Sequence, residues 1–366
     1  MHALQEGVLL YPVYALLFAD AGLTTGEISS LFAIWSVVSF TCEIPAGALA
    51  DAWSRKRLYA LGEITTAAGF GVWLLWPSYP GFALGFVLWG LGGAFSSGTL
   101  EALIYDHLGD GTAYSRVIGR ARTAGLLGML VATLLTGPVH LAGGYLLVGT
   151  ISVATVALGG LLALRLPEQP RSGTGDDGDS APAMLRSGLR AVTGRGTIRV
   201  LVVAAAVPGF SALDEYLPLL AREMGAATHG VPLLFALTAL AMAAGNALAG
   251  HFPPVTSRPL GGALALSAGL LAGGALVPHP AGMIGVSAAF GLLQFAMVHA
   301  ETRLQDAITG PARATALSVA GFGAEVCAVA LYAAFALPVP VSHLIAATAL
   351  PLLLTFLLSW PGRRNH

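Results

Sequence analysis

The segment Gly47-Ala-Leu-Ala-Asp51-Ala-Trp-Ser-Arg55-Lys56-Arg57-Leu58 separates two long apolar runs of the chain, at 27–49 and 58–77. Each run is long enough to cross a bilayer core of about 30 Å as a helix that rises about 1.5 Å per residue. The segment is therefore predicted to be a short polar loop between two membrane-spanning helices. Its three consecutive basic residues indicate the cytoplasmic side of the membrane, where positive charge is enriched.

The same pattern of apolar runs extends over the whole chain of 366 residues, of which 55% are hydrophobic and 10% charged. A soluble domain carries roughly 25% charged residues, and the mean hydropathy of +0.75 is high for a water-exposed protein. A β-barrel would need alternating strands of about ten residues, and the sequence contains no series of them. We predict an all-α polytopic membrane protein with twelve transmembrane helices, at about 3–20, 27–49, 58–77, 81–105, 118–138, 142–165, 198–221, 230–250, 259–277, 281–303, 313–337 and 340–360.

The basic residues support this map of spans. All but one of the 18 lysine and arginine residues fall in loops and ends that the map places on one side of the membrane, and Arg222 is the exception. The positive-inside rule then predicts that both termini are cytoplasmic. The Ala, Gly and Arg content is typical of a GC-rich bacterial genome, so a bacterial plasma membrane is the expected location. A net charge of −1 gives no electrostatic reason to expect a nucleic-acid partner.

The segment Pro167–Ala183 is rich in Gly, Ser, Pro and Asp and divides the predicted spans six from six. A segment of this composition cannot bury enough apolar surface to fold. We therefore predict a flexible cytoplasmic linker at 167–196, between an N-terminal six-helix bundle at 1–166 and a C-terminal six-helix bundle at 197–366.

The two halves of the chain carry a trace of an internal repeat, a feature of membrane proteins that are built from two related bundles. Glu101 precedes Asp106 by five residues at the cytoplasmic end of span 4. Glu301 precedes Asp306 by five residues at the same end of span 10. The equivalent position of the two pairs in the six-span order favours a duplicated six-helix unit.

The loop segment resembles the loop signature of the major facilitator superfamily, Gly-x-Leu-Ala-Asp-x-x-Gly-Arg-Lys/Arg, and departs from it at Ser54, where the family usually has glycine. The resemblance implies two six-helix bundles that rock about a site near the midplane, and a functional monomer. In the family the loop aspartate latches the two halves together on the inner side, and Asp51 matches it, while the glycine at the start permits close helix approach. The predicted inner gate and loop motif comprise Gly47, Asp51, Arg55, Lys56, Arg57, Glu43 and Arg313.

Three further stretches resemble one bacterial, drug-efflux-like branch of that superfamily. They are Glu43-Ile-Pro45-Ala-Gly47 before the loop, Ser97-Gly-Thr-Leu-Glu101-Ala-Leu-Ile-Tyr-Asp106 at the end of span 4, and Arg313-Ala-Thr315-Ala-Leu-Ser318 at the start of span 11. Together with the span count, the resemblance covers essentially the whole chain. It implies a transport role and leaves the cargo open.

Eight acidic residues fall inside predicted spans, where charge is costly and usually marks an ion or substrate path. No basic residue lies near the centre of a span. A carrier of organic anions would normally need a buried arginine to neutralise its cargo. The acids therefore indicate proton binding, a cationic cargo, or both. They are Glu6, Glu43, Glu63, Glu101, Asp214, Glu215, Glu301 and Glu325.

The acids of spans 7 and 11 are the first candidates for proton coupling. Glu325 lies near the middle of span 11, and the alternative role for it is a protonated side chain bonded to another helix. Asp214 and Glu215 lie in the outer half of span 7, where successive residues differ by about 100° and only one is expected to face the cavity. The alternative for this pair is an interfacial position near Arg222.

The acids nearer the cytoplasm have two interpretations. Glu101 and Glu301 either line the substrate cavity or form inner-gate contacts with Arg116 or Arg313. Glu63 is assigned a gate or structural role, and the Glu6 carboxyl is expected to be partly hydrated near the inner face.

Neutral polar residues are candidates for shaping the cargo pocket, because spans 1, 4, 7 and 10 line the cavity in the family that the chain resembles. Tyr11 and Tyr14 in span 1 are three residues apart and are expected to share a helix face, with a kink at Pro12 between them as the alternative. Gln294 in span 10 and Asn246 in span 8 are further candidates, each with hydrogen bonding to a neighbouring helix as the alternative. His299 in span 10 is a candidate proton relay.

These features predict a secondary active transporter that exports small amphipathic or cationic compounds by proton-coupled alternating access. The alternatives are an importer of a neutral metabolite in the same fold, and a polytopic membrane protein without transport activity. The sequence contains no His-Glu-x-x-His, no Gly-x-Ser-x-Gly and no Cys/His metal spacing, so we expect no enzyme activity, no cofactor and no metal. The expected partners are a small-molecule substrate, protons and the lipid bilayer.

Overall fold

The computed structural model describes residues 1–108, 111–167, 195–252, 257–307 and 312–359, and the elements in these ranges are helices, with no strand among them. Two compact units form, one from Met1–Gly173 with Ala227–Ala236 and the other from Thr174–Ala226 with Leu237–His366. The predicted linker at 167–196 lies almost entirely outside the described residues.

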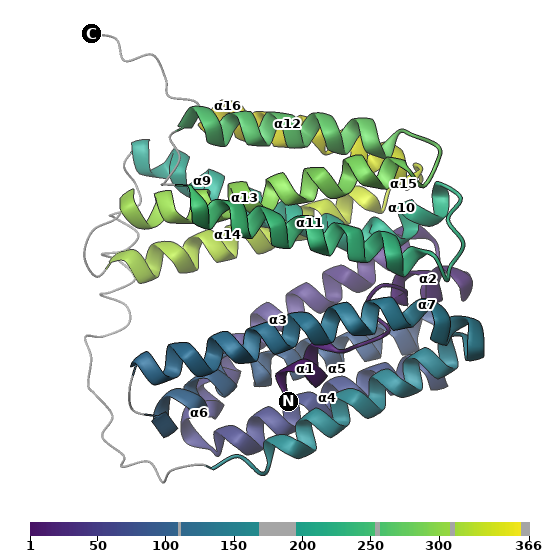
Figure 1. Ribbon diagram of the computed structural model, residues 1–366, viewed down its shortest axis with the longest axis vertical. Coiled ribbons are helices and arrows are strands. Elements are labelled where there is room, and N and C mark those ends of the chain that lie inside the picture. The colour runs from purple at the N-terminus through teal and green to yellow at the C-terminus, as the bar shows by residue number, and fades with distance from the viewer. Residues whose placement is uncertain (109–110, 168–194, 253–256, 308–311, 360–366) are drawn as a thin grey trace. The chain divides into compact units, whose positions relative to one another are not determined.

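The helices are shown in Figure 1. The first unit contains α1 (His2–Glu6), α2 (Tyr14–Asp20), α3 (Thr25–Ala52), α4 (Arg55–Leu75), α5 (Tyr79–Ser96), α6 (Thr99–Leu108) and α7 (Gly111–Ala163). The second part of the chain contains α9 (Arg195–Gly209), the 3₁₀ segment η1 (Phe210–Tyr216), α10 (Leu217–Glu223), α11 (Val231–His251), α12 (Ser257–Ala275), α13 (Gly282–Ala307), α14 (Ala312–Phe335), α15 (Val341–Ala347) and α16 (Ala349–Ser359).

Each of the twelve predicted spans has a helical counterpart among the described residues. Eight helical segments are long and apolar enough to cross a membrane, and shorter apolar helices cover Pro259–Ala275 and Val341–Leu357. α7 accounts for two predicted spans, because its helical geometry breaks at Gly143 and Gly144, where Gly144 has φ +61°. The remaining counterpart, span 1, is an interrupted helix. The prediction of an all-α polytopic fold is confirmed.

Local sequence accounts for several helix ends. Thr24 and Glu27 form a capping box at the start of α3, in which the Glu27 N–H donates to Thr24 Oγ1 over 3.2 Å and the Thr24 N–H donates to Glu27 Oε2 over 2.8 Å. Gly98 has φ +64°, a conformation that favours glycine. Predicted span 4 therefore consists of two helices, α5 and α6, rather than one.

Span 1, predicted as a single helix, consists of α1 and α2 with the irregular segment 7–13 between them. Two hydroxyl groups of α7 satisfy the buried backbone of this segment. The Leu10 N–H donates to Ser152 Oγ over 3.1 Å, and Thr136 Oγ1 donates to the Leu9 carbonyl over 2.9 Å. Irregular backbone at membrane depth is tolerated only where protein or enclosed water satisfies its polar groups, so these two side chains explain how the break is accommodated.

Glycine residues allow close approach between neighbouring helices. A Cβ on Gly62 of α4 would lie 2.7 Å from the carbonyl oxygen of Gly92, and a Cβ on Gly69 would lie 2.6 Å from the carbonyl oxygen of Gly85. The antiparallel helices α4 and α5 therefore touch through their backbones at two levels. In the second unit α12 and α13 meet in the same way, because a Cβ on Gly274 would lie 2.7 Å from a carbonyl oxygen of α13.

Candidate functional site

The first unit contains a polar cavity of about 340 Å³ between α1, α4 and the junction of α5 with α6. Helix α1 begins the chain and α4 follows the basic loop, so the predicted topology places this cavity toward the cytoplasmic end of the unit. The break at Gly98 turns the start of α6 toward the cavity. The residues that line it are His2, Gln5, Glu6, Tyr59, Gly93, Ser96, Ser97, Gly98, Leu100 and Glu101.

Tyr59 of α4 connects the acidic groups around this cavity. Its hydroxyl donates to Oε1 of Gln5 over 2.9 Å and so links α4 to α1. Glu63, one turn further along α4, is 3% exposed, and its carboxyl lies close enough to the Tyr59 hydroxyl to interact with it. The carboxyl groups of Glu6 and Glu101 are close enough to act electrostatically on Tyr59. Carboxyl groups from three helices therefore gather around one hydroxyl.

This arrangement has a defined chemical capacity. Burial in a medium of low dielectric disfavours a charged carboxylate unless a proton or a cation accompanies it. The Tyr59 hydroxyl and the Gln5 amide supply hydrogen bonds that orient the acid. The cavity is thus suited to hold a proton or a small cation.

A second group of acids lies where α9, η1 and α14 meet in the second unit. Asp214 and Glu215 are neighbours on η1. Tyr332 of α14 is 3% exposed and lies close enough to the carboxyl groups of Glu215, Asp214 and Glu325 to interact with them electrostatically. The structure therefore brings together three of the acids that the sequence analysis selected.

Close packing between α9 and α14 positions this second group. Gly209 at the end of α9 lies directly against Cys327, where a Cβ on the glycine would overlap the Cβ of the cysteine. Beyond this contact, the ring of Tyr216 stacks on Phe335, with ring centroids 4.0 Å apart. These contacts hold η1 against α14 on either side of the acidic residues.

Helix α13 carries two of the predicted site residues in contrasting surroundings. The His299 side chain is 3% exposed, its ring lies edge-on to Phe295 at 4.5 Å, and its Nε2 has no hydrogen-bond partner among the described residues. Glu301 is exposed, and its Oε1 accepts a hydrogen bond from Gln305 over 3.3 Å. The two glutamates of the internal repeat thus differ, because Glu101 borders the polar cavity.

The two tyrosine candidates pack against the same ring. Tyr11 is half-buried and its ring stacks on Trp89 at 5.7 Å, and Tyr14, 4% exposed within an aromatic core, meets Trp89 edge-on at 5.9 Å. Helix α2 begins only at Tyr14, so this shared side arises from the turn that precedes α2 and not from one continuous helix. Gln294 on α13 is half-buried, and Asn246 on α11 is exposed.

A sequence model of the Major Facilitator Superfamily matches residues 2–333 of the chain. The chain belongs to the Major Facilitator Superfamily. It is accordingly a multi-pass membrane protein, and its family and fold are those of transporters. No similar sequence was found among curated proteins.

Solved structures of facilitator proteins have the same fold. An auto-inhibited POT family peptide transporter is similar with a TM-score of 0.73 and 15% identity, over 100% of this chain and 97% of that chain. A bacterial homolog of the human lysosomal transporter Spinster, in an inward-facing and unoccupied conformation, is similar with a TM-score of 0.73 and 16% identity, over 98% and 94%. The nucleoside transporter NupG is similar with a TM-score of 0.72 and 14% identity, over 99% and 98%. At these identities the likeness establishes the fold alone.

The facilitator loop motif joins α3 to α4. Ser54, which replaces the usual glycine, caps α4, because its Oγ accepts a hydrogen bond from the Arg57 N–H over 3.3 Å. The departure from the family pattern therefore has a local structural role. The Lys56 Nζ donates to the Leu166 carbonyl over 3.4 Å, at the end of α7, while Arg55 is half-buried.

The other members of the predicted inner gate are only partly described. Glu43 is exposed on α3. No described atom lies within 4 Å of the position that a Cβ on Gly47 would take, and the close helix approach at Gly47 stays a prediction. The side chains of Asp51 and Arg313 lie outside the described residues, and the latch in this facilitator stays a prediction.

The sequence analysis missed Gln5 and Tyr59 and gave Glu63 a gate or structural role. Part of the signal was present, because Tyr59 and Glu63 are four residues apart and so share a face of α4. The residue that this face contacts could not be predicted from the neighbouring sequence, because Gln5 lies 54 positions away from Tyr59.

Proposed function

We propose that this facilitator is a secondary active transporter that exports a small amphipathic or cationic compound in exchange for protons. The observation that supports it best is the pair of tyrosine-centred acidic groups inside the spans. Tyr59 lies among Glu6, Glu63 and Glu101 in the first unit. The second unit repeats the theme around Tyr332 with different helices.

The chemistry of exchange follows from competition for carboxylates. A deprotonated acid in a cavity of low dielectric binds a cation, and protonation removes the charge that holds it. Proton entry would then displace the cargo. The emptied, protonated protein would reopen toward the cytoplasm at lower electrostatic cost, because its acids are neutral. In this proposal alternating access moves the two bundles around the site, with Asp51 and Arg55 of the loop motif closing the cytoplasmic side.

The setting of this transporter is part of the proposal. We place it in a bacterial plasma membrane, as a monomer of the drug-efflux-like branch with both termini in the cytoplasm. The distribution of lysine and arginine along the sequence supports this orientation.

Import of a neutral polar metabolite is the second candidate. The polar cavity also offers neutral hydrogen-bonding groups, from Gln5, Ser96 and Ser97. Two of the structurally similar proteins are a peptide transporter and a nucleoside transporter. A cargo without charge would use these amide and hydroxyl groups, with the acids serving only the proton.

Proton flux in sealed liposomes tests the proposal. The purified protein is reconstituted, a pH gradient is imposed, and a panel of lipophilic cations is added. We expect at least one cation to dissipate the gradient in the wild type, and we expect Glu325→Gln and Glu63→Gln each to abolish that flux. Glu27→Gln is the matched control, because glutamine preserves the capping box of α3 while removing one exposed charge.

The outcomes separate the candidates. A gradient that collapses with cations only in the wild type and in Glu27→Gln supports exchange. Proton entry together with uptake of a neutral metabolite would support import. Full cation-driven flux in both glutamine variants would remove the acids from the mechanism.

A further inference from the structure

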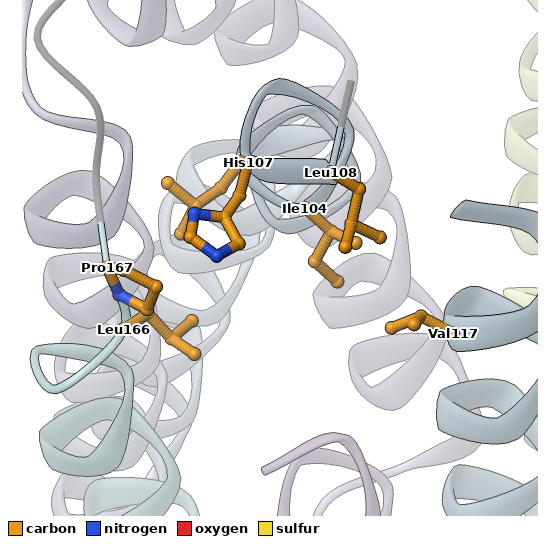
Figure 2. A pocket seen from close by; sticks show the side chains of 7 residues that line it. Ile104, His107, Leu108, Val117, Leu166 and Pro167 are labelled. Atoms are coloured by element: carbon orange, nitrogen blue, oxygen red, sulfur yellow. The ribbon is translucent and has the colours of Figure 1, made fainter. Parts of the chain in front are cut away.

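The first unit contains a second cavity that is apolar and separate from the acidic one. Its volume is about 140 Å³, and three segments build it: α6, the start of α7, and the residues that follow the end of α7. Figure 2 shows the side chains of these segments around a common open space, with the His107 ring among them. The lining residues are Leu103, Ile104, His107, Leu108, Val117, Leu166 and Pro167, and we call this cavity the apolar slot.

The predicted topology places the apolar slot near the cytoplasmic surface of the membrane. α6 ends, α7 begins and the last turn after α7 closes at this place, which the predicted topology assigns to the cytoplasmic side. Large apolar side chains of the same segments stay exposed beside it, with Tyr105 at 54%, Val117 at 40% and Leu164 at 45%. In a membrane these side chains contact lipid, so the apolar surface of the slot continues into the bilayer.

Positively charged side chains border the apolar slot. Arg116 and Arg120 are exposed; Arg116 directly precedes Val117 of the lining, and Arg120 lies one turn further along α7 on the same side as Val117. Arg165 is exposed and directly precedes Leu166 of the lining. The slot therefore has cationic groups on two sides, from both ends of α7.

A fourth cation reaches the same edge from a different helix. The Lys56 Nζ contacts the Leu166 carbonyl over 3.4 Å, a long hydrogen bond that an incoming anion can replace. Charge at this edge is complementary to phosphate, and the apolar lining is complementary to an acyl chain. A phospholipid carries both a phosphate and acyl chains, and it is always present at the membrane surface.

We propose that the apolar slot binds an anionic phospholipid of the cytoplasmic leaflet, with an acyl chain among Ile104, Val117 and Leu166 and the phosphate near Arg116, Arg165 and Lys56. Clusters of basic residues at the membrane surface attract anionic lipids, and a slot between helices adds selectivity for one bound molecule over the bulk leaflet. The transported cargo is a poor alternative, because the lining offers one polar side chain, that of His107, and no acidic one. The lipid would join the two ends of α7 to α6 and so stabilise the unit.

Lipid binding to the purified, delipidated full chain in detergent tests the proposal. The thermal unfolding midpoint and native mass spectra are recorded with phosphatidylglycerol, phosphatidylcholine or inorganic phosphate. We expect phosphatidylglycerol alone to raise the midpoint and to remain bound in the mass spectrum. Each arginine near an anionic headgroup contributes about 1 kcal/mol to lipid binding, so the double variant Arg116→Gln with Arg165→Gln should bind phosphatidylglycerol roughly tenfold or more weakly. Arg199→Gln, at an exposed arginine of α9, is the control and should leave this affinity unchanged.

A second variant tests the apolar part. Val117→Trp fills the slot and should remove the preference for phosphatidylglycerol while leaving all cationic groups in place. Equal stabilisation by phosphatidylcholine, or by phosphate alone, would overturn the proposal. Unchanged phosphatidylglycerol binding in the double arginine variant would overturn it as well, and that test does not depend on Val117→Trp folding. Neither readout involves transport, so the result is independent of the proposed exchange of protons and cargo.

Discussion

Tyr59 and Tyr332 occupy comparable surroundings in the two units, although they come from non-equivalent spans. Each is buried, and each lies near carboxyl groups from more than one helix. A tyrosine hydroxyl both donates and accepts a hydrogen bond, so it can contact an acid in either protonation state. This property makes the two tyrosines suitable neighbours for groups that gain and lose a proton.

At the residue scale we predict that Tyr59→Phe destabilises the protein. The substitution removes the hydrogen bond from Tyr59 to Gln5 and a polar neighbour of the buried Glu63, which costs about 1–3 kcal/mol. The unfolding midpoint in detergent measures this effect. Tyr145→Phe is the matched control, because the Tyr145 hydroxyl donates to Asp20 over 2.6 Å at an exposed position, where water can replace it. Equal losses in the two variants would contradict the importance given to the buried hydrogen bond.

At the scale of helices, the acidic groups coincide with interruptions. Glu6 ends α1 just before the irregular segment 7–13, Glu101 follows the break at Gly98, and Asp214 lies on the 3₁₀ segment η1. Interrupted helices expose backbone groups and are a recurrent feature of binding sites in transporters. The interruptions therefore fall in spans 1, 4 and 7, and each of these spans carries a candidate acid.

Glycine contacts make a prediction at this scale. Gly69→Ala should destabilise the first unit by about 1–3 kcal/mol, because its Cβ would lie 2.6 Å from the Gly85 carbonyl oxygen and the two backbones must separate. Gly71→Ala, two residues further along α4, meets no described atom within 4 Å and should be neutral or stabilising by up to about 1 kcal/mol. Denaturation of both variants in the same detergent checks the pair. Similar stabilities would show that α4 and α5 do not depend on the backbone contact.

At the scale of the whole molecule, the loop motif predicts a defect of turnover rather than of folding. Asp51→Asn should slow transport in liposomes while the yield and the unfolding midpoint stay close to the wild-type values. The reason is that the predicted latch at Asp51 affects the change between the inward-open and outward-open states, not the folding of either bundle. Asp20→Asn, at an exposed residue that ends α2, is the control and should transport normally. Normal transport by Asp51→Asn at normal expression would remove the latch from the mechanism.

The fold class followed from the sequence alone, for a simple physical reason. A bilayer requires a minimum length of every apolar helix that crosses it and favours positively charged loops on the cytoplasmic side. Runs such as 27–49 and 58–77, with the basic residues between them, are therefore sufficient to predict a membrane-spanning helical fold. Both constraints are local. The loop motif added the family, which the match over residues 2–333 confirmed.

The arrangement of the acids depended on the tertiary structure. The sequence analysis named Glu325, Asp214 and Glu215 as candidates, but it could not show that they lie near one another beside Tyr332. It also predicted an unbroken first span, because an apolar run looks helical when the hydroxyls that satisfy its broken backbone, those of Ser152 and Thr136, lie more than a hundred residues away.

Apolar length and charge sign are properties of neighbouring residues, and the sequence by itself therefore determined the spans, their expected orientation and the family. Hydrogen bonds such as the one from Tyr59 to Gln5 join residues that only folding brings together. Whether a carboxyl lies in a cavity, on an exposed face or beside a tyrosine was decided by helix packing, because the electrostatic cost of a charge depends on everything around it.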